Sequence, residues 1–173
     1  MSNDGKKEVW LRGPLPGIPG LLQPVAHALL QAREEVNELM KNFPDELLWE
    51  RPAGTASPGF HLQHMAGVLD RLFTYANAQL LSEEQLNWLE MEEKPSPQTN
   101  TVVLLVHQFN RQVDTAIEQL KKTKEGSLLQ SKGVGRAQIP STVLGLLVHA
   151  AEHTMRHLGQ LIVTARILKT KAG

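Results

Sequence analysis

Cysteine is absent from all 173 residues of the chain. This absence excludes disulfide bonds, thiolate metal ligands and a cysteine nucleophile. Any metal site must therefore be built from histidine, aspartate and glutamate side chains. Any sulfur atom that takes part in chemistry must come from a small molecule.

An excess of positive charge is also missing, because 18 lysines and arginines balance 18 aspartates and glutamates. A protein that binds nucleic acid mainly through its phosphates needs such an excess, so we expect no nucleic-acid partner. No window approaches the roughly 20 apolar residues of a membrane-spanning helix, and the polar N-terminus "MSNDGKKEVW" is unlike a signal peptide. These absences predict a cytoplasmic protein without a membrane partner.

Helical periodicity dominates what the sequence does contain. Apolar residues recur every three or four positions in four segments. The first begins near Leu21, the second near Ser57, the third near either Thr99 or Asn100, and the fourth near Ser141. Ser57 and Ser141 are typical N-cap residues, and proline follows Ser57 at the first helical position. No convincing alternating strand pattern lies between these segments. The fold class that we predict is therefore all-α, as an antiparallel four-helix bundle.

Three further segments complete the expected organisation. The glycines and prolines of "RGPLPGIPG" predict an extended N-terminal tail over residues 1–20, followed by the bundle over residues 21–173. The stretch "SEEQLNWLEM" predicts a short amphipathic helix, with Ser82 and Gln85 spaced as a capping box. Residues 126–140 have three glycines and no sustained period, which predicts a long loop before the last helix.

Five of the seven histidines fall in two short windows. His61 and His64 lie on the second long helix, and His149, His153 and His157 lie on the last. Residues four apart on a helix share one face, so two imidazoles can converge on one ion while a facing helix supplies a third. A metal also satisfies several ring nitrogens that would otherwise be buried without partners. The clustering therefore predicts a metal site.

Spacing alone does not choose the members of that site. His149 and His157 lie eight residues apart, about 12 Å along a helix axis, which is too far for both to share one ion. His153 belongs to either pair. If the second and last long helices ran parallel, counting from their predicted starts would place His64 nearer the level of His149. The choice between His149 and His157 stays open on these grounds.

The segment "FHLQHMAGVLDRL", followed about ninety residues later by "HAAEHTMRHLGQL", resembles the DinB/YfiT-like family. The similarity extends from roughly Leu21 to Lys169. Members of this family are four-helix bundles with a three-histidine metal site. Carried over by position, the resemblance implies that His64, His153 and His157 are the metal ligands.

The same resemblance places other residues around the ion. Gln160 ends the motif as a binding residue, and His61 and His149 become pocket residues that could act as a base. Arg136 in the loop and Arg156 beside the histidines could meet an anionic substrate group, although a solvated surface position is equally compatible with each. Trp10 and Arg12 in the tail are candidates to cover the pocket.

The chemistry that follows is metal-dependent. Three imidazoles leave an open coordination position, and the resemblance implies one divalent ion, zinc or nickel. The absence of paired Glu and Glu-x-x-His motifs argues against a di-iron centre. Family members of known activity activate the sulfur of a low-molecular-weight thiol for transfer or isomerisation, while hydrolysis is suggested for many others. We therefore expect a transferase that acts on a small-molecule substrate with such a thiol.

Two alternatives accompany this expectation. The first is a hydrolase in which the metal activates water. The second is a non-catalytic module that binds a metal or a partner protein, which predicts no space beside the ion. The oligomeric state is open, with a homodimer as one candidate.

Overall fold

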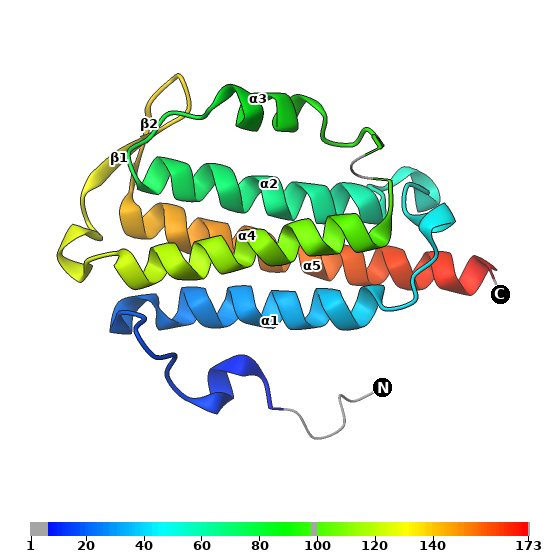
Figure 1. The fold of residues 1–173 in the computed structure, drawn as a ribbon, viewed down its shortest axis with the longest axis horizontal. Helices are drawn as coiled ribbons and strands as arrows, with labels where there is room; N and C mark the ends of the chain where they lie inside the picture. The colour runs from blue at the N-terminus through cyan, green and yellow to red at the C-terminus, as the bar shows by residue number, and fades with distance from the viewer. Residues whose placement is uncertain (1–6, 98–99, 173) are drawn as a thin grey trace.

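Four long helices form the body of the protein, and a short one lies outside them (Figure 1). The computed structural model describes residues 7–97 and 100–172. The long helices are α1 (Gln23–Met40), α2 (Pro58–Ala76), α4 (Val102–Lys122) and α5 (Val143–Ala172), and the short one is α3 (Glu83–Glu90). The predicted all-α bundle is confirmed. Among the described helices, none is both long and apolar enough to cross a membrane.

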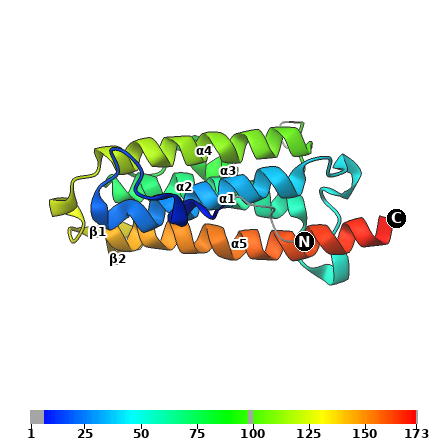
Figure 2. The ribbon, with the colours of Figure 1, turned by 90° about the horizontal axis from the view of Figure 1, so that it is seen from below.

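The arrangement of the long helices decides which faces meet. Helices α2 and α1 lie at opposite corners of the bundle, and each packs against both α4 and α5 (Figures 1 and 2). Helix α5 runs parallel to α1, since Lys169 near its end donates to the carbonyl of Leu39 near the end of α1. It runs antiparallel to α2. The segment that carries α3 spans the length of the bundle, so α4 runs in the same direction as α2. The predicted antiparallel arrangement therefore holds for α2 with α5 and for α1 with α4, and is wrong for the parallel neighbours α1 with α5 and α2 with α4.

The core fills the space between these four helices. Each contributes an apolar stripe at helical spacing, as the periodicity predicts, and the largest fully buried side chains come from all four. They include Leu29 of α1, Leu69 of α2, Phe109 of α4 and Leu158 of α5. This core gives the backbone of α2 and α5 a fixed position, on which the polar side chains discussed below depend.

The helix starts follow the predicted capping chemistry, with two shifts. The hydroxyl of Ser57 accepts from the amide of Phe60, and both halves of the predicted capping box at the start of α3 are present. The prediction of Ser141 as the last cap is wrong by one residue. Ser141 pairs within a strand, and the amide of Gly145 donates instead to Thr142.

The start of α4 is also displaced from the prediction. Its cap is Thr101, whose hydroxyl accepts from the amide of Leu104. Asn100 lies just before this cap, and Thr99 lies outside the described residues. Thr101 is one residue nearer the apolar run than Asn100 and two nearer than Thr99, and its hydroxyl has the same capping chemistry as that of Thr99, which explains the small difference.

The segment before α5 is more regular than predicted. It holds an antiparallel hairpin of two four-residue strands, β1 (Ser131–Val134) and β2 (Ile139–Thr142). Gly135 and Gln138 have positive φ values of 65° and 48°, which allow the chain to reverse between the strands. The strands are short and none of their residues is fully buried, so they leave no clear alternation in the sequence.

The tail lies along α1, on the side facing away from α2 (Figure 1). Its residues 1–6 lie outside the described part of the chain, and Val9–Arg12 form a short 3-10 helix. The amide of Val9 donates to Gln31, and the guanidinium of Arg12 pairs with both oxygens of Glu34 at 2.7 and 2.8 Å. Trp10 is 60% exposed. The expectation that Trp10 and Arg12 cover the histidines is therefore wrong, because α1 provides the partners of the tail.

Candidate metal centre

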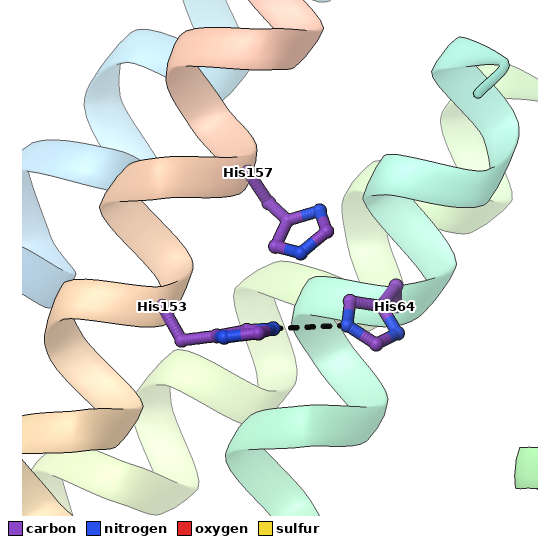
Figure 3. Close-up of side chains that lie close together, drawn as sticks. All are labelled: His64, His153 and His157. Carbon is purple, nitrogen blue, oxygen red and sulfur yellow. Dashed lines mark hydrogen bonds between the residues drawn. The ribbon is translucent and has the colours of Figure 1, made fainter. Parts of the chain in front are cut away.

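Three histidines from two helices point toward one another (Figure 3). His64 comes from α2, and His153 and His157 come from successive turns of α5. One ring nitrogen of each lies within 4.8 Å of those of the other two, a grouping that could hold a metal ion. Nε2 of His64 lies 3.0 Å from Nε2 of His153. The structure thus brings together the three residues that the resemblance implies.

The direction of the helices explains this pairing. Because α2 and α5 are antiparallel, a residue nearer the N-terminus of α2 lies beside a residue nearer the C-terminus of α5. His64 accordingly meets His153, and His61 meets His157 with their Nδ1 atoms 3.1 Å apart. Counting residues from the predicted helix starts placed His64 near His149 on the assumption that the two helices are parallel. That placement is wrong because the helices are antiparallel.

His149 lies on the solvent side of the cluster. Its side chain is 50% exposed, and its Nδ1 lies 2.8 Å from Oε1 of Glu152. With Glu152 and His153 it forms a second group whose geometry could hold a metal. This group shares His153 with the first and is more exposed, so water competes more strongly for its ligand atoms. The three-histidine group is the better candidate.

The donor atoms fit a small divalent ion. Four-coordinate zinc with Zn–N bonds of about 2.05 Å holds its ligand nitrogens roughly 3.3 Å apart. The His64–His153 separation of 3.0 Å is close to this value, and the third nitrogen lies within 4.8 Å. Nδ1 of His153 is buried and has no hydrogen-bond partner among the described residues. Such a partly satisfied histidine cluster is costly without a ligand.

Burial keeps His61, His153 and His157 neutral at pH 7. Burial first, and then the neighbouring His64, lower the pKa of His157 to about 3 and that of His61 to about 4. Burial and then His64 also lower the pKa of His153. A neutral imidazole has a lone pair for a metal, so little proton competition opposes metal binding at pH 7.

A buried carboxylate that the sequence patterns did not single out contacts the cluster. Oε2 of Glu92, just after α3, lies 2.6 Å from Nδ1 of His64, and its Oε1 lies 2.8 Å from Nη1 of Arg71. Within residues 7–97 and 100–172, neither Nη1 of Arg71 nor Oε1 of Glu92 has another partner, so this ion pair compensates both charges. Glu92 stands in "MEEKPSPQ", where the local pattern does not distinguish it from the exposed Glu93.

The other candidate residues divide into one that joins the cluster and three that lie at the surface. His61 is only 3% exposed and contacts His157. Gln160 is exposed on α5, and Arg156 is exposed and pairs with Glu152 at 2.7 Å. Arg136 is exposed in the turn between β1 and β2. The structure therefore brings His61 into the cluster and leaves the two arginines and Gln160 at the surface.

A cavity of about 260 Å³ borders the cluster through Phe60. The Phe60 ring stacks on His64 with centroids 5.0 Å apart and meets His157 edge-on at 6.0 Å. The cavity is lined by Trp49, Arg51, Ser57, Phe60, Glu93 and Pro95. A larger hollow of about 730 Å³ includes Ala76 in its lining. Ala76 is about 18 Å along α2 from His64, so of these two cavities the smaller one lies nearer the histidines.

Comparison with known proteins places this arrangement in a family. The family model of the DinB superfamily matches residues 28–161. The chain belongs to the DinB superfamily. The matched range includes all three clustered histidines and leaves out the tail.

The fold of this superfamily member has a solved counterpart. A crystal structure from Enterococcus faecalis, described as a conserved protein of locus, has a TM-score of 0.68 and 20% sequence identity. The similarity covers 86% of this chain and 97% of the other, which shows that the two share a fold. A comparison with curated proteins finds no match.

The lowered pKa values predict a pH-dependent stability of the metal-free protein. In the unfolded chain these histidines take up protons near pH 6.5, whereas folded His61 and His157 do so only near pH 4 and 3. The unfolded state therefore binds more protons below pH 6.5, and the free energy of unfolding should fall as pH drops from about 6.5 toward 3. Urea unfolding at pH 7 and pH 5, with chelator present, measures this change.

A His157→Gln variant is the matched control for this measurement. It lacks one of the depressed groups, so its loss of stability between pH 7 and pH 5 should be smaller than that of the unmodified protein. An equal loss in both proteins would show that His157 does not contribute to the pH dependence.

Proposed function

We propose that this protein is a metal-dependent enzyme of the DinB superfamily that binds one divalent ion, zinc or nickel, through His64, His153 and His157. The observation that carries the proposal is the convergence of three imidazole nitrogens, from two antiparallel helices, within 4.8 Å. When bound, such an ion would supply a Lewis-acid centre with an open position that favours the ionised form of a coordinated thiol or water. The imidazole set suits zinc and nickel alike.

The reaction class that we favour is transfer involving a low-molecular-weight thiol. The chain has no cysteine, so a reacting sulfur must belong to a small molecule. The cavity beside Phe60 provides space for such a molecule, with apolar walls from Trp49 and Pro95. Arg51 and Glu93 add opposite charges to its lining, which could orient a polar substrate. The cavity reaches the histidines through Phe60, whose ring stacks on His64, and none of the three histidines is among its lining residues.

A hydrolase is the second candidate, and the position of His149 favours it. His149 is exposed, lies one turn before His153, and pairs with the carboxylate of Glu152. A solvent-accessible histidine oriented by a carboxylate can accept a proton from water and release it. His61 is less suited to that role, because burial lowers its pKa to about 4 and makes it a weak base.

Metal content tests the ligand assignment. We expect about one zinc or nickel ion per chain in protein purified without added metal, and loss of nearly all of it in a His64→Ala, His153→Ala double variant. His157→Ala should lose much more metal than His149→Ala, since His149 faces solvent. Elemental analysis of the four proteins measures this. Greater loss from His149→Ala would assign the metal to the outer group instead.

Activity against a substrate panel separates the two reaction classes. The metal-loaded protein should consume electrophiles only when a cellular thiol is supplied, and His153→Ala should abolish this turnover. Product formation with and without a panel of thiols, followed by mass spectrometry, measures it. Thiol-independent ester or amide cleavage that His153→Ala removes would favour the hydrolase. Absence of turnover under all these conditions would support the non-catalytic module.

A further inference from the structure

Glu92 joins two residues of α2 that lie seven positions apart. His64 and Arg71 share one face of the helix, two turns from each other, and the carboxylate of Glu92 lies between them. The side chains of Glu92 and Arg71 are 8% and 10% exposed. A buried ion pair of this kind is seldom a net gain in stability, so its presence beside a candidate ligand suggests a role in that ligand's chemistry.

Two features of α2 hold the carboxylate in place. The side-chain amide of Gln63 donates to the carbonyl of Met91 at 3.3 Å and accepts from the amide of Glu93 at 3.1 Å. The backbone on both sides of Glu92 is therefore fixed to the helix that carries His64. This clamp explains how a residue outside the regular helices can keep a precise position.

The second feature is Gly67, in the interior of α2. A Cβ atom there would lie 2.7 Å from Nη1 of Arg71 and 2.8 Å from Oε1 of Glu92. Glycine costs a helix about 0.5–1 kcal/mol relative to alanine. The missing side chain makes room for the ion pair at that position, which indicates that the helix accommodates the pair at some cost to its own stability.

The contact with Glu92 fixes the tautomer of His64. An ionised carboxylate only accepts hydrogen bonds, so Nδ1 of a neutral His64 must be the donor. The lone pair then lies on Nε2, the nitrogen that faces His153. Without an ion, Nε2 of His153 donates to this lone pair, and its buried Nδ1 is left without a partner. The carboxylate thus prepares His64 to bind an ion through Nε2.

We propose that Glu92 is a positioning residue for His64, with Arg71 pairing with its carboxylate and Gly67 leaving the space that this pair occupies. The proposal rests on the proposed metal-binding function. Glu92 acts through His64 rather than on a substrate. It holds the proton on Nδ1, orients the ring toward His153, and raises the basicity of Nε2 toward a metal.

The test compares Glu92→Gln with Glu90→Gln, which makes the same chemical change at an exposed residue at the end of α3. Zinc affinity is measured by competition with a chelating indicator, and the tautomer of His64 is read from ¹⁵N NMR of the metal-free proteins. Glu92→Gln should weaken zinc binding about 10- to 100-fold. It should also reduce the Nδ1–H tautomer of His64, because the glutamine amide that replaces one oxygen can donate toward Nδ1. Glu90→Gln should match the unmodified protein in both measurements.

A Gly67→Ala variant tests the same role with Glu92 unchanged, which covers the case in which Glu92→Gln does not fold. Alanine favours the helix but displaces the ion pair, so zinc affinity should fall while helix content by circular dichroism is kept. Equal zinc affinity in Glu92→Gln and Glu90→Gln, or an Nε2–H tautomer of His64 in the unmodified protein, would overturn the proposal. A protein that binds no zinc but shows the Glu92-dependent tautomer would contradict the metal function and leave the positioning role standing.

Discussion

The antiparallel packing of α2 against α5 is the constraint on which the candidate site depends. Because the two helices run in opposite directions, His64 faces His153 while His61 faces His157. The segment between α2 and α4, which contains α3, places Glu92 on the outer side of α2. There its carboxylate reaches the ring nitrogen of His64 that faces away from His153.

Local patterns predicted the helices because capping and periodicity act over a few residues. Ser57 and the Ser82–Gln85 capping box begin α2 and α3 as expected, whereas Thr142 replaced Ser141 because a strand extends to that point. The clustering of histidines pointed to a metal site, and the family resemblance named the three that the structure groups. Periodicity carries no information on the direction of a helix, so counting from the helix starts paired His64 with the wrong histidine. Glu92 could not be found because its burial arises from tertiary packing.

Several features of the site lower the stability of the folded protein, and the rest of the fold must compensate for them. Burial disfavours charge on His61 and His157, the pair of Arg71 and Glu92 is removed from water, and Gly67 weakens α2. The apolar core between the four helices provides the compensating stability. Such a concentration of unfavourable features in one region is typical of functional sites rather than of structural contacts.

X-ray absorption at the zinc edge of the zinc-loaded protein tests the central claim most directly. The account predicts three imidazole nitrogens at about 2.0–2.1 Å and one additional light atom from water or a buffer ligand. The imidazole contribution should drop to two rings in His157→Ala and stay at three in His149→Ala. A zinc shell with fewer than two imidazoles, or one that loses a ring in His149→Ala but not in His157→Ala, would contradict the assignment of His64, His153 and His157 as the metal centre.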